Sequence, residues 1–145
     1  MSIEIITTSL ELDVYGYGGI AMNRDYVGTV FKLMDRMWQS VKGNNLENNG
    51  QNIWIYEPNE KVFAGVELAA APSPAIGLEN KKISLSKYSY YKHTGAYSLI
   101  KTMGLAMRTE ITNRGLAFGD TYIEIYGHWS NDESKLETEL IMELK

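Results

Sequence analysis

The chain has 145 residues, of which 44% are apolar and 22% are charged, and its formal net charge is -4. This is the size and composition of one globular domain, with no cysteine for disulfides or thiolate chemistry. The acidic balance disfavours direct nucleic-acid binding, no apolar run reaches the roughly 18 residues of a membrane span, and the N-terminus lacks secretion-signal features, so we expect a soluble cytoplasmic protein.

The first half of the sequence predicts a strand, a long helix and two more strands. Alternating apolar residues or β-formers mark the strands, over 10–19, 52–57 and 62–71. Apolar residues recur at three- and four-residue spacing over 23–43, which predicts one amphipathic helix. Asn23 is its expected N-cap and Gly43 its expected C-terminal stop.

The second half repeats this order. A tyrosine-rich strand, a helix and two strands are predicted over 84–95, 96–115, 121–127 and 135–144. The connection over 71–83 contains Pro72 and Pro74, which suit neither a helix interior nor a central strand. We expect a single domain over 1–145, built from pseudo-repeats at about 8–70 and 83–145.

The two repeats align most clearly in the strands that follow each helix. "IWIY" at 53–56 matches "IEIY" at 123–126, and "GVEL" at 65–68 matches "IMEL" at 141–144. Two βαββ units predict an α+β fold with an antiparallel-rich sheet, two long helices on one face and a ligand groove on the other. Strand alternation places Ile53 and Ile55 on the expected helix-covered face and Trp54 on the open one.

Several segments resemble one known family. The chain is similar to the GyrI-like, or AraC-type effector-binding, domain in "FAGVELA", in "HTGAY" and in the ending "YIEIYGHWSNDESKLETELIMEL". The resemblance implies a duplicated βαββ fold whose central groove accepts hydrophobic, often cationic, compounds. It also implies that a buried glutamate on a late strand meets the positive charge, and the matching residue is Glu124. The early start of the domain suggests the stand-alone form of the family.

Glu124 is the principal candidate site residue. It lies between Tyr122 and Tyr126 on one face of a strand, where aromatic rings and a partly buried carboxylate together favour a cation. A solvated carboxylate on an open sheet face is the alternative explanation. Further candidates for the groove are the aromatic residues Trp54, Tyr56, Tyr88 and Tyr90 and the acidic residues Glu67 and Glu139. The sequence leaves open whether Tyr88 and Tyr90, or Ser89 and Tyr91, face inward.

The leading functional hypothesis is a non-catalytic binder of hydrophobic, cationic, drug-like small molecules, acting as a sensor or sequestering module with a regulatory protein or a second copy as partner. No metal-ligand spacing, cofactor motif or catalytic triad is present, so neither a catalytic residue nor a cofactor is assigned. One alternative is a small-molecule hydrolase in which Glu124 activates water. Another is an interaction protein of the gyrase-inhibitor type.

Overall fold

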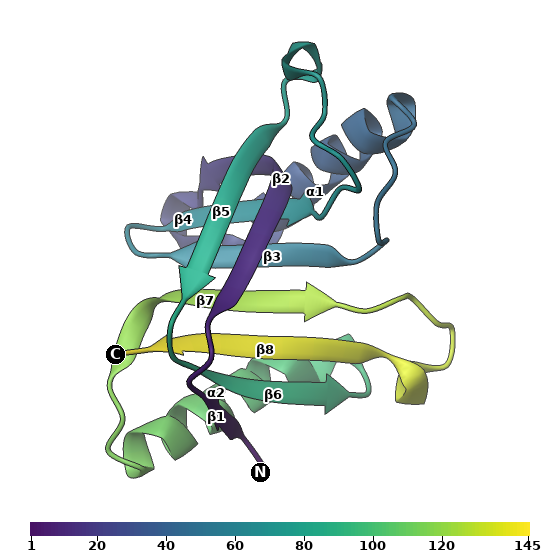
Figure 1. The fold of residues 1–145 in the computed structure, drawn as a ribbon. Helices are drawn as coiled ribbons and strands as arrows, with labels where there is room; N and C mark the ends of the chain where they lie inside the picture. Colours follow the sequence, from purple (N-terminus) through teal and green to yellow (C-terminus); the bar gives the residue numbers. More distant parts are fainter.

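The computed structural model describes residues 1 to 145 and contains two α-helices and eight strands (Figure 1). The helices are α1 (Tyr26–Gly43) and α2 (Ile100–Asn113). The strands are β1 (Glu4–Ile6), β2 (Leu10–Ile20), β3 (Asn52–Glu57), β4 (Lys61–Val66), β5 (Glu79–Leu85), β6 (Tyr88–Thr94), β7 (Phe118–Tyr126) and β8 (Glu137–Leu144). Short 3₁₀ segments occupy Met22–Arg24, Pro74–Ile76, Tyr97–Leu99 and Glu133–Lys135.

All eight strands form one antiparallel sheet in the order β1-β6-β8-β7-β3-β4-β2-β5. The units β2-α1-β3-β4 and β6-α2-β7-β8 confirm the predicted α+β fold of duplicated βαββ units. They meet at the central pair β3–β7, where Trp54 lies opposite Glu124. Ala64 is the next partner of Trp54, and Leu140 is the next partner of Glu124, so the aligned segments occupy matching places in the sheet.

The sheet curls because β2 and β5 bend over the face that carries the isoleucines. β2 pairs with β4 through its second half and with β5 through its first half. A side chain at Gly16 would collide with the backbone of Ala64, so only glycine allows this approach. The curled side encloses a core made of strand residues, which are Val14, Ile53, Ile55, Phe63, Ile83, Leu85, Tyr88, Ile123, Ile125 and Ile141.

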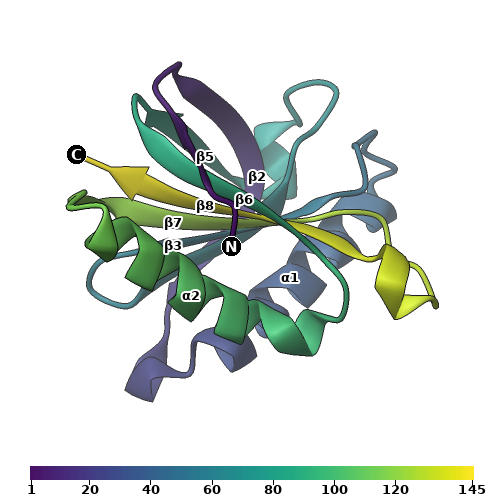
Figure 2. The same cartoon turned by 90° about the horizontal axis from the view of Figure 1, so that it is seen from below.

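Both helices cover the opposite, convex face of the sheet (Figure 2). Val30 of α1 packs with Trp54 and Ala64, and Met107 of α2 packs with Leu140. The prediction that the helices cover Ile53 and Ile55 is therefore wrong. The isoleucines are buried by the curled sheet itself, which leaves the helices on the same side as Trp54.

Two local predictions also need correction. Helix α1 begins at Tyr26 after the N-cap Asp25, whose carboxylate accepts a 3.1 Å hydrogen bond from the Gly28 N–H, whereas Asn23 lies in the preceding 3₁₀ segment. The predicted connection over 71–83 contains most of β5, which pairs with β2. Neither helix is long and apolar enough to cross a membrane.

Candidate functional site

A cavity of about 600 Å³ lies between α1 and α2, above the central strands β3 and β7. This volume is within the range of small-molecule sites. Its floor includes alternate residues of the two strands, which are Asn52, Trp54 and Tyr56 from β3 and Tyr122, Glu124 and Tyr126 from β7. The groove is therefore on the helix-bearing face, and its predicted position on the face without helices is wrong.

Glu124 is held by three tyrosine hydroxyls. Tyr56 and Tyr126 each donate to its Oε1 atom at 3.1 Å, and Tyr122 donates to Oε2 at 2.7 Å. Its side chain is buried, with 7% exposure, and the ion pairs of the structure involve other carboxylates. The carboxylate is neither free in bulk solvent nor neutralised by a lysine or arginine.

Burial raises the pKa of Glu124, because removal from water disfavours the charged form. The hydrogen bonds from Tyr122, Tyr126 and Tyr56 lower the pKa and offset part of this effect. The pKa of each of these three tyrosines is raised, first by burial and next by the negative charge of Glu124. The tyrosines therefore remain neutral donors, and the cavity floor holds one titratable acid.

Aromatic rings surround this acid in a connected arrangement. Tyr56 and Tyr122 stack with ring centroids 5.5 Å apart, and Trp54 lies 4.7 Å from Tyr126. Phe31 of α1 meets Trp54 edge-on at 5.2 Å, and Tyr97 meets Tyr126 edge-on at 5.4 Å. These contacts position several π-faces and ring edges around a single carboxylate.

The two helices form walls of the cavity with residues that were not predicted as site residues. Val27, Phe31 and Met34 of the predicted apolar stripe line the cavity, whereas Val30, Met37 and Val41 of the same stripe are buried. The apolar stripe is wide enough both to pack against the core and to line the cavity. Its periodicity does not show which residues face the core and which face the cavity. The wall from the α2 side consists of Tyr97, Ile100, Lys101, Gly104, Leu105 and Arg108.

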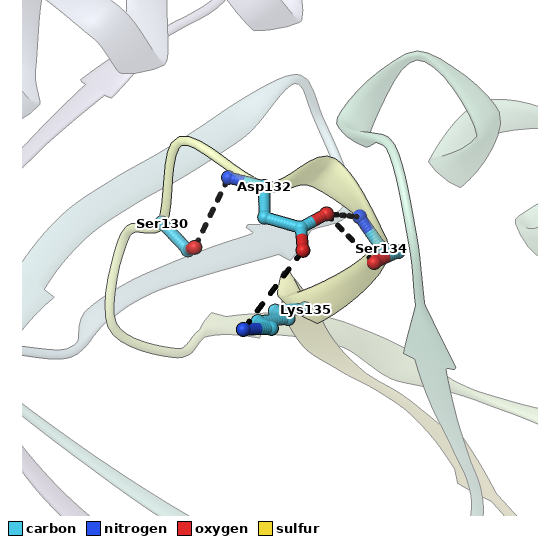
Figure 3. Close-up of polar contacts among 4 residues, drawn as sticks. All are labelled: Ser130, Asp132, Ser134 and Lys135. Carbon is cyan, nitrogen blue, oxygen red and sulfur yellow. Dashed lines mark hydrogen bonds and ion pairs between the residues drawn. The ribbon is translucent and has the colours of Figure 1, made fainter.

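The loop between β7 and β8 borders the cavity and carries Trp129. This side chain lines the cavity and is 75% exposed. The loop is stabilised by Asp132, whose carboxylate accepts hydrogen bonds from the backbone N–H and hydroxyl of Ser134 and lies 3.9 Å from Lys135 (Figure 3). The Asp132 N–H donates to the hydroxyl of Ser130, so the support is local.

Four of the predicted site residues lie away from this cavity. Tyr88 belongs to the core on the curled side, and Tyr90 packs against that core while donating a 2.6 Å hydrogen bond to Glu139. Glu67 follows β4 and does not line the cavity. The open question about the tyrosine-rich strand is thereby resolved, because Tyr91 packs on the side of α2.

No family model matches the sequence, and no curated protein matches it as a relative. Many solved structures share its fold, and three of them are described below. The C-terminal domain of EcmrR, a protein also seen in a DNA complex, matches with a TM-score of 0.70 and 12% identity over 100% of this chain and 99% of that one. SAV2435 bound to tetraphenylphosphonium matches with a TM-score of 0.65 and 18% identity, over 100% and 94% of the two chains.

A hydrolase from Listeria innocua has a lower TM-score of 0.58 at 9% identity, over 99% of this chain and 91% of that one. Identities this low show a common fold and no more. The chain therefore has an architecture that it shares with a phosphonium-bound protein, with the terminal domain of a DNA-binding protein and with a hydrolase.

Proposed function

We propose that the groove binds hydrophobic organic cations and that Glu124 is their counter-ion. The observation that carries this proposal is the state of the carboxylate. It is buried on the floor of a cavity, it is surrounded by aromatic rings, and its hydrogen bonds come from neutral hydroxyls rather than from a cation. A positive charge is the chemical complement that the protein itself does not place against it.

The energetics favour a cation over a neutral guest of the same shape. Burial disfavours the ionised form of Glu124, and an arriving positive charge recovers part of that free energy. Each well-placed ring adds about 0.5–2 kcal/mol of cation–π attraction. A neutral aromatic molecule gains the stacking and the apolar burial alone.

The three tyrosine hydroxyls around Glu124 also determine which class of cation fits the site. Tyrosine hydroxyls occupy three of the roughly four lone-pair positions that a carboxylate offers. A ligand therefore has little room to donate hydrogen bonds to Glu124 without displacing a tyrosine. Cations whose charge is shielded or spread over rings, such as phosphonium or rhodamine-type compounds, fit this geometry better than a primary amine.

The fold comparison supports this proposal, since SAV2435 has been solved with tetraphenylphosphonium. We infer that the protein acts as a binding module, either sensing such compounds or sequestering them, with a regulatory protein or a second copy as the partner that reads the bound state. Catalysis is not part of this function.

Calorimetric titration with tetraphenylphosphonium tests the proposal. Wild-type protein binds it, and Glu124→Gln weakens binding by about 1–3 kcal/mol, the range for loss of a charged partner. Glu139→Gln is the matched control, because Glu139 also accepts a hydrogen bond from a tyrosine but lies outside the cavity. A loss of no more than about 0.3 kcal/mol at Glu124, within the usual error of such comparisons, excludes the counter-ion role.

A hydrolytic role for the same residue is the alternative. Burial raises the pKa of Glu124, as a general base acting near neutral pH requires, and a hydrolase shares the fold. In this case wild-type protein turns over an aromatic ester or a similar electrophile in the groove, and Glu124→Gln abolishes turnover while ligand binding remains. Absence of turnover with ligands that bind tightly rejects this alternative.

A further inference from the structure

The wall formed by α2 carries two cations that a site for simple organic cations does not need. Lys101 and Arg108 both line the cavity, on the same side as Gly104 and Leu105. They are seven residues apart, which corresponds to about two helical turns and roughly 10 Å along the axis. The cavity is therefore bordered by two positive charges while its floor holds one acid.

Neither cation is neutralised by a carboxylate of the protein. The ion-paired residues are Lys81 with Glu57, Lys92 with Glu137, Arg114 with Glu110, and Lys135 with Asp132. Glu110, the acid nearest to Arg108 in the sequence of α2, is engaged by Arg114 at 3.0 Å. Lys101 and Arg108 thus remain able to pair with a group that enters the cavity.

Arg108 is held in place by aromatic rings rather than by an acid. Its guanidinium carbon lies 5.6 Å from the ring centroid of Tyr122 and 5.5 Å from that of Phe118. Tyr122 is also the residue that donates to Oε2 of Glu124. One ring therefore contacts the fixed positive charge and bonds to the fixed negative charge, and the two charges form no ion pair with each other.

This arrangement separates two charges of opposite sign within one cavity. A monocation seated on Glu124 meets two like charges on the α2 wall, which weaken its binding. A molecule with a cationic ring system and an anionic group at its other end satisfies both. Guanidinium and ammonium groups are the usual partners of carboxylate and sulfonate oxygens, and the guanidinium offers a two-pronged contact.

We infer that the natural ligands of the groove are amphoteric aromatic compounds, with the cationic end on Glu124 and a carboxylate or similar anionic group on Lys101 and Arg108. This inference rests on the proposed function and names the ligand class of the same site. It extends that function by adding a second recognition element, located on α2, to the acidic floor.

A matched pair of dyes tests the inference on the full-length protein. One is a rhodamine ethyl ester, whose only charge is the cationic ring system, and the other is the same rhodamine with its carboxylate free. Fluorescence anisotropy at neutral pH and low salt gives both dissociation constants. Wild-type protein binds the free acid about tenfold more tightly, the gain expected of one charge-assisted contact.

Substitution of the two cations should weaken binding of the free acid without weakening binding of the ester. In Lys101→Gln/Arg108→Gln the free acid loses about tenfold in affinity, whereas the ester binds equally well or more tightly because repulsion is relieved. Lys101→Gln alone, which leaves the Arg108–Tyr122 contact intact, shows the same trend in smaller degree. Arg114→Gln, at the end of the same helix but outside the cavity, leaves both affinities unchanged.

The outcomes separate this inference from the function on which it rests. If both dyes bind equally to wild-type protein and both are weakened by Glu124→Gln, the counter-ion proposal stands and the amphoteric class is rejected. If neither dye responds to Glu124→Gln, both proposals fail. A free-acid preference that survives loss of Lys101 and Arg108 also overturns the inference, since another group then recognises the carboxylate.

Discussion

Trp54 and Glu124 lie directly opposite each other on the central strand pair β3–β7. They occupy matching positions of the two βαββ units, so the duplicated fold places an indole in one half and a carboxylate in the other. Both are buried, with 6% and 7% exposure, beneath the gap between α1 and α2. Because one half contributes the indole and the other the carboxylate, the two similar halves together form a single site that is both charged and aromatic.

Cation binding should depend on pH through Glu124. Because burial raises its pKa, the carboxyl group holds its proton to a higher pH than an exposed glutamate does. Affinity for tetraphenylphosphonium, whose charge does not titrate, therefore falls as pH decreases through that raised value, by at most about tenfold per pH unit. Titrations between pH 4 and 8 measure the effect, and Glu124→Gln should show a flat profile. An equally steep profile in the variant assigns the titration to another group.

Glu124 should also make the ligand-free protein less stable as the pH rises. Its pKa is higher in the folded protein than in the unfolded chain, so the folded state binds the proton more tightly. The free energy of unfolding therefore decreases through the window from the ordinary carboxyl pKa of 4.5 up to the raised value. Relative to Glu124→Gln, the wild-type protein should lose stability across this window in urea titrations. A relative gain with rising pH contradicts this account.

Removal of the Tyr122 hydroxyl should move the pH dependence of binding upward. This hydroxyl donates the 2.7 Å hydrogen bond to Oε2 of Glu124 and lowers the pKa of that carboxyl group. In Tyr122→Phe the ring remains and the pKa rises further, so cation binding reaches its plateau at higher pH. Tyr91→Phe is the matched control, because Tyr91 packs on the same side of the sheet without a bond to Glu124. A midpoint that stays at the wild-type pH shows that the hydrogen bond does not tune the acid.

Substitution by alanine should affect ligand binding at the cavity-lining apolar residues of α1 and stability at its buried ones. Phe31 is 47% exposed and lines the cavity, so Phe31→Ala should weaken cation binding by about 0.5–1.5 kcal/mol while changing the free energy of unfolding by less than about 1 kcal/mol. Met37 is fully buried, and Met37→Ala should cost about 2–5 kcal/mol of stability. Chemical denaturation and calorimetry distinguish the pair. Equal stability losses place Phe31 in the core and remove it from the groove.

The strands and helices that follow directly from periodicity were predictable, as was the position of Tyr122 and Tyr126 on the same strand face as Glu124. Residues two apart on a strand share a face. The alignment of the repeats shows that β3 and β7 are equivalent strands, whereas their direct pairing is seen only in the structure. The side of the sheet that carries the groove was not predictable. Periodicity shows that Ile53 and Ile55 are buried together, but it does not show whether a helix or the curled sheet buries them.

The walls depend on helix placement, which the sequence does not encode locally. Phe31 and Val30 are neighbours on the apolar stripe of α1, yet one faces the cavity and the other the core. Arg108 reaches the cavity only because α2 crosses the sheet beside Tyr122. The strands β1 and β5 were missed because both lie outside the two βαββ units, at the edges of the sheet, where β1 pairs with β6 and β5 pairs with β2. In addition, β5 lies in a segment that begins with turn-forming prolines.

The most direct measurement is a crystal structure with tetraphenylarsonium, whose heavy atom is located from its anomalous signal. The account predicts one peak in the cavity between α1 and α2, with the cation within about 6 Å of the aromatic ring centroids around Glu124, as cation–π contact requires. A peak on the curled side of the sheet near Tyr88, or only on the outer surface, contradicts the assignment of Glu124 as the counter-ion.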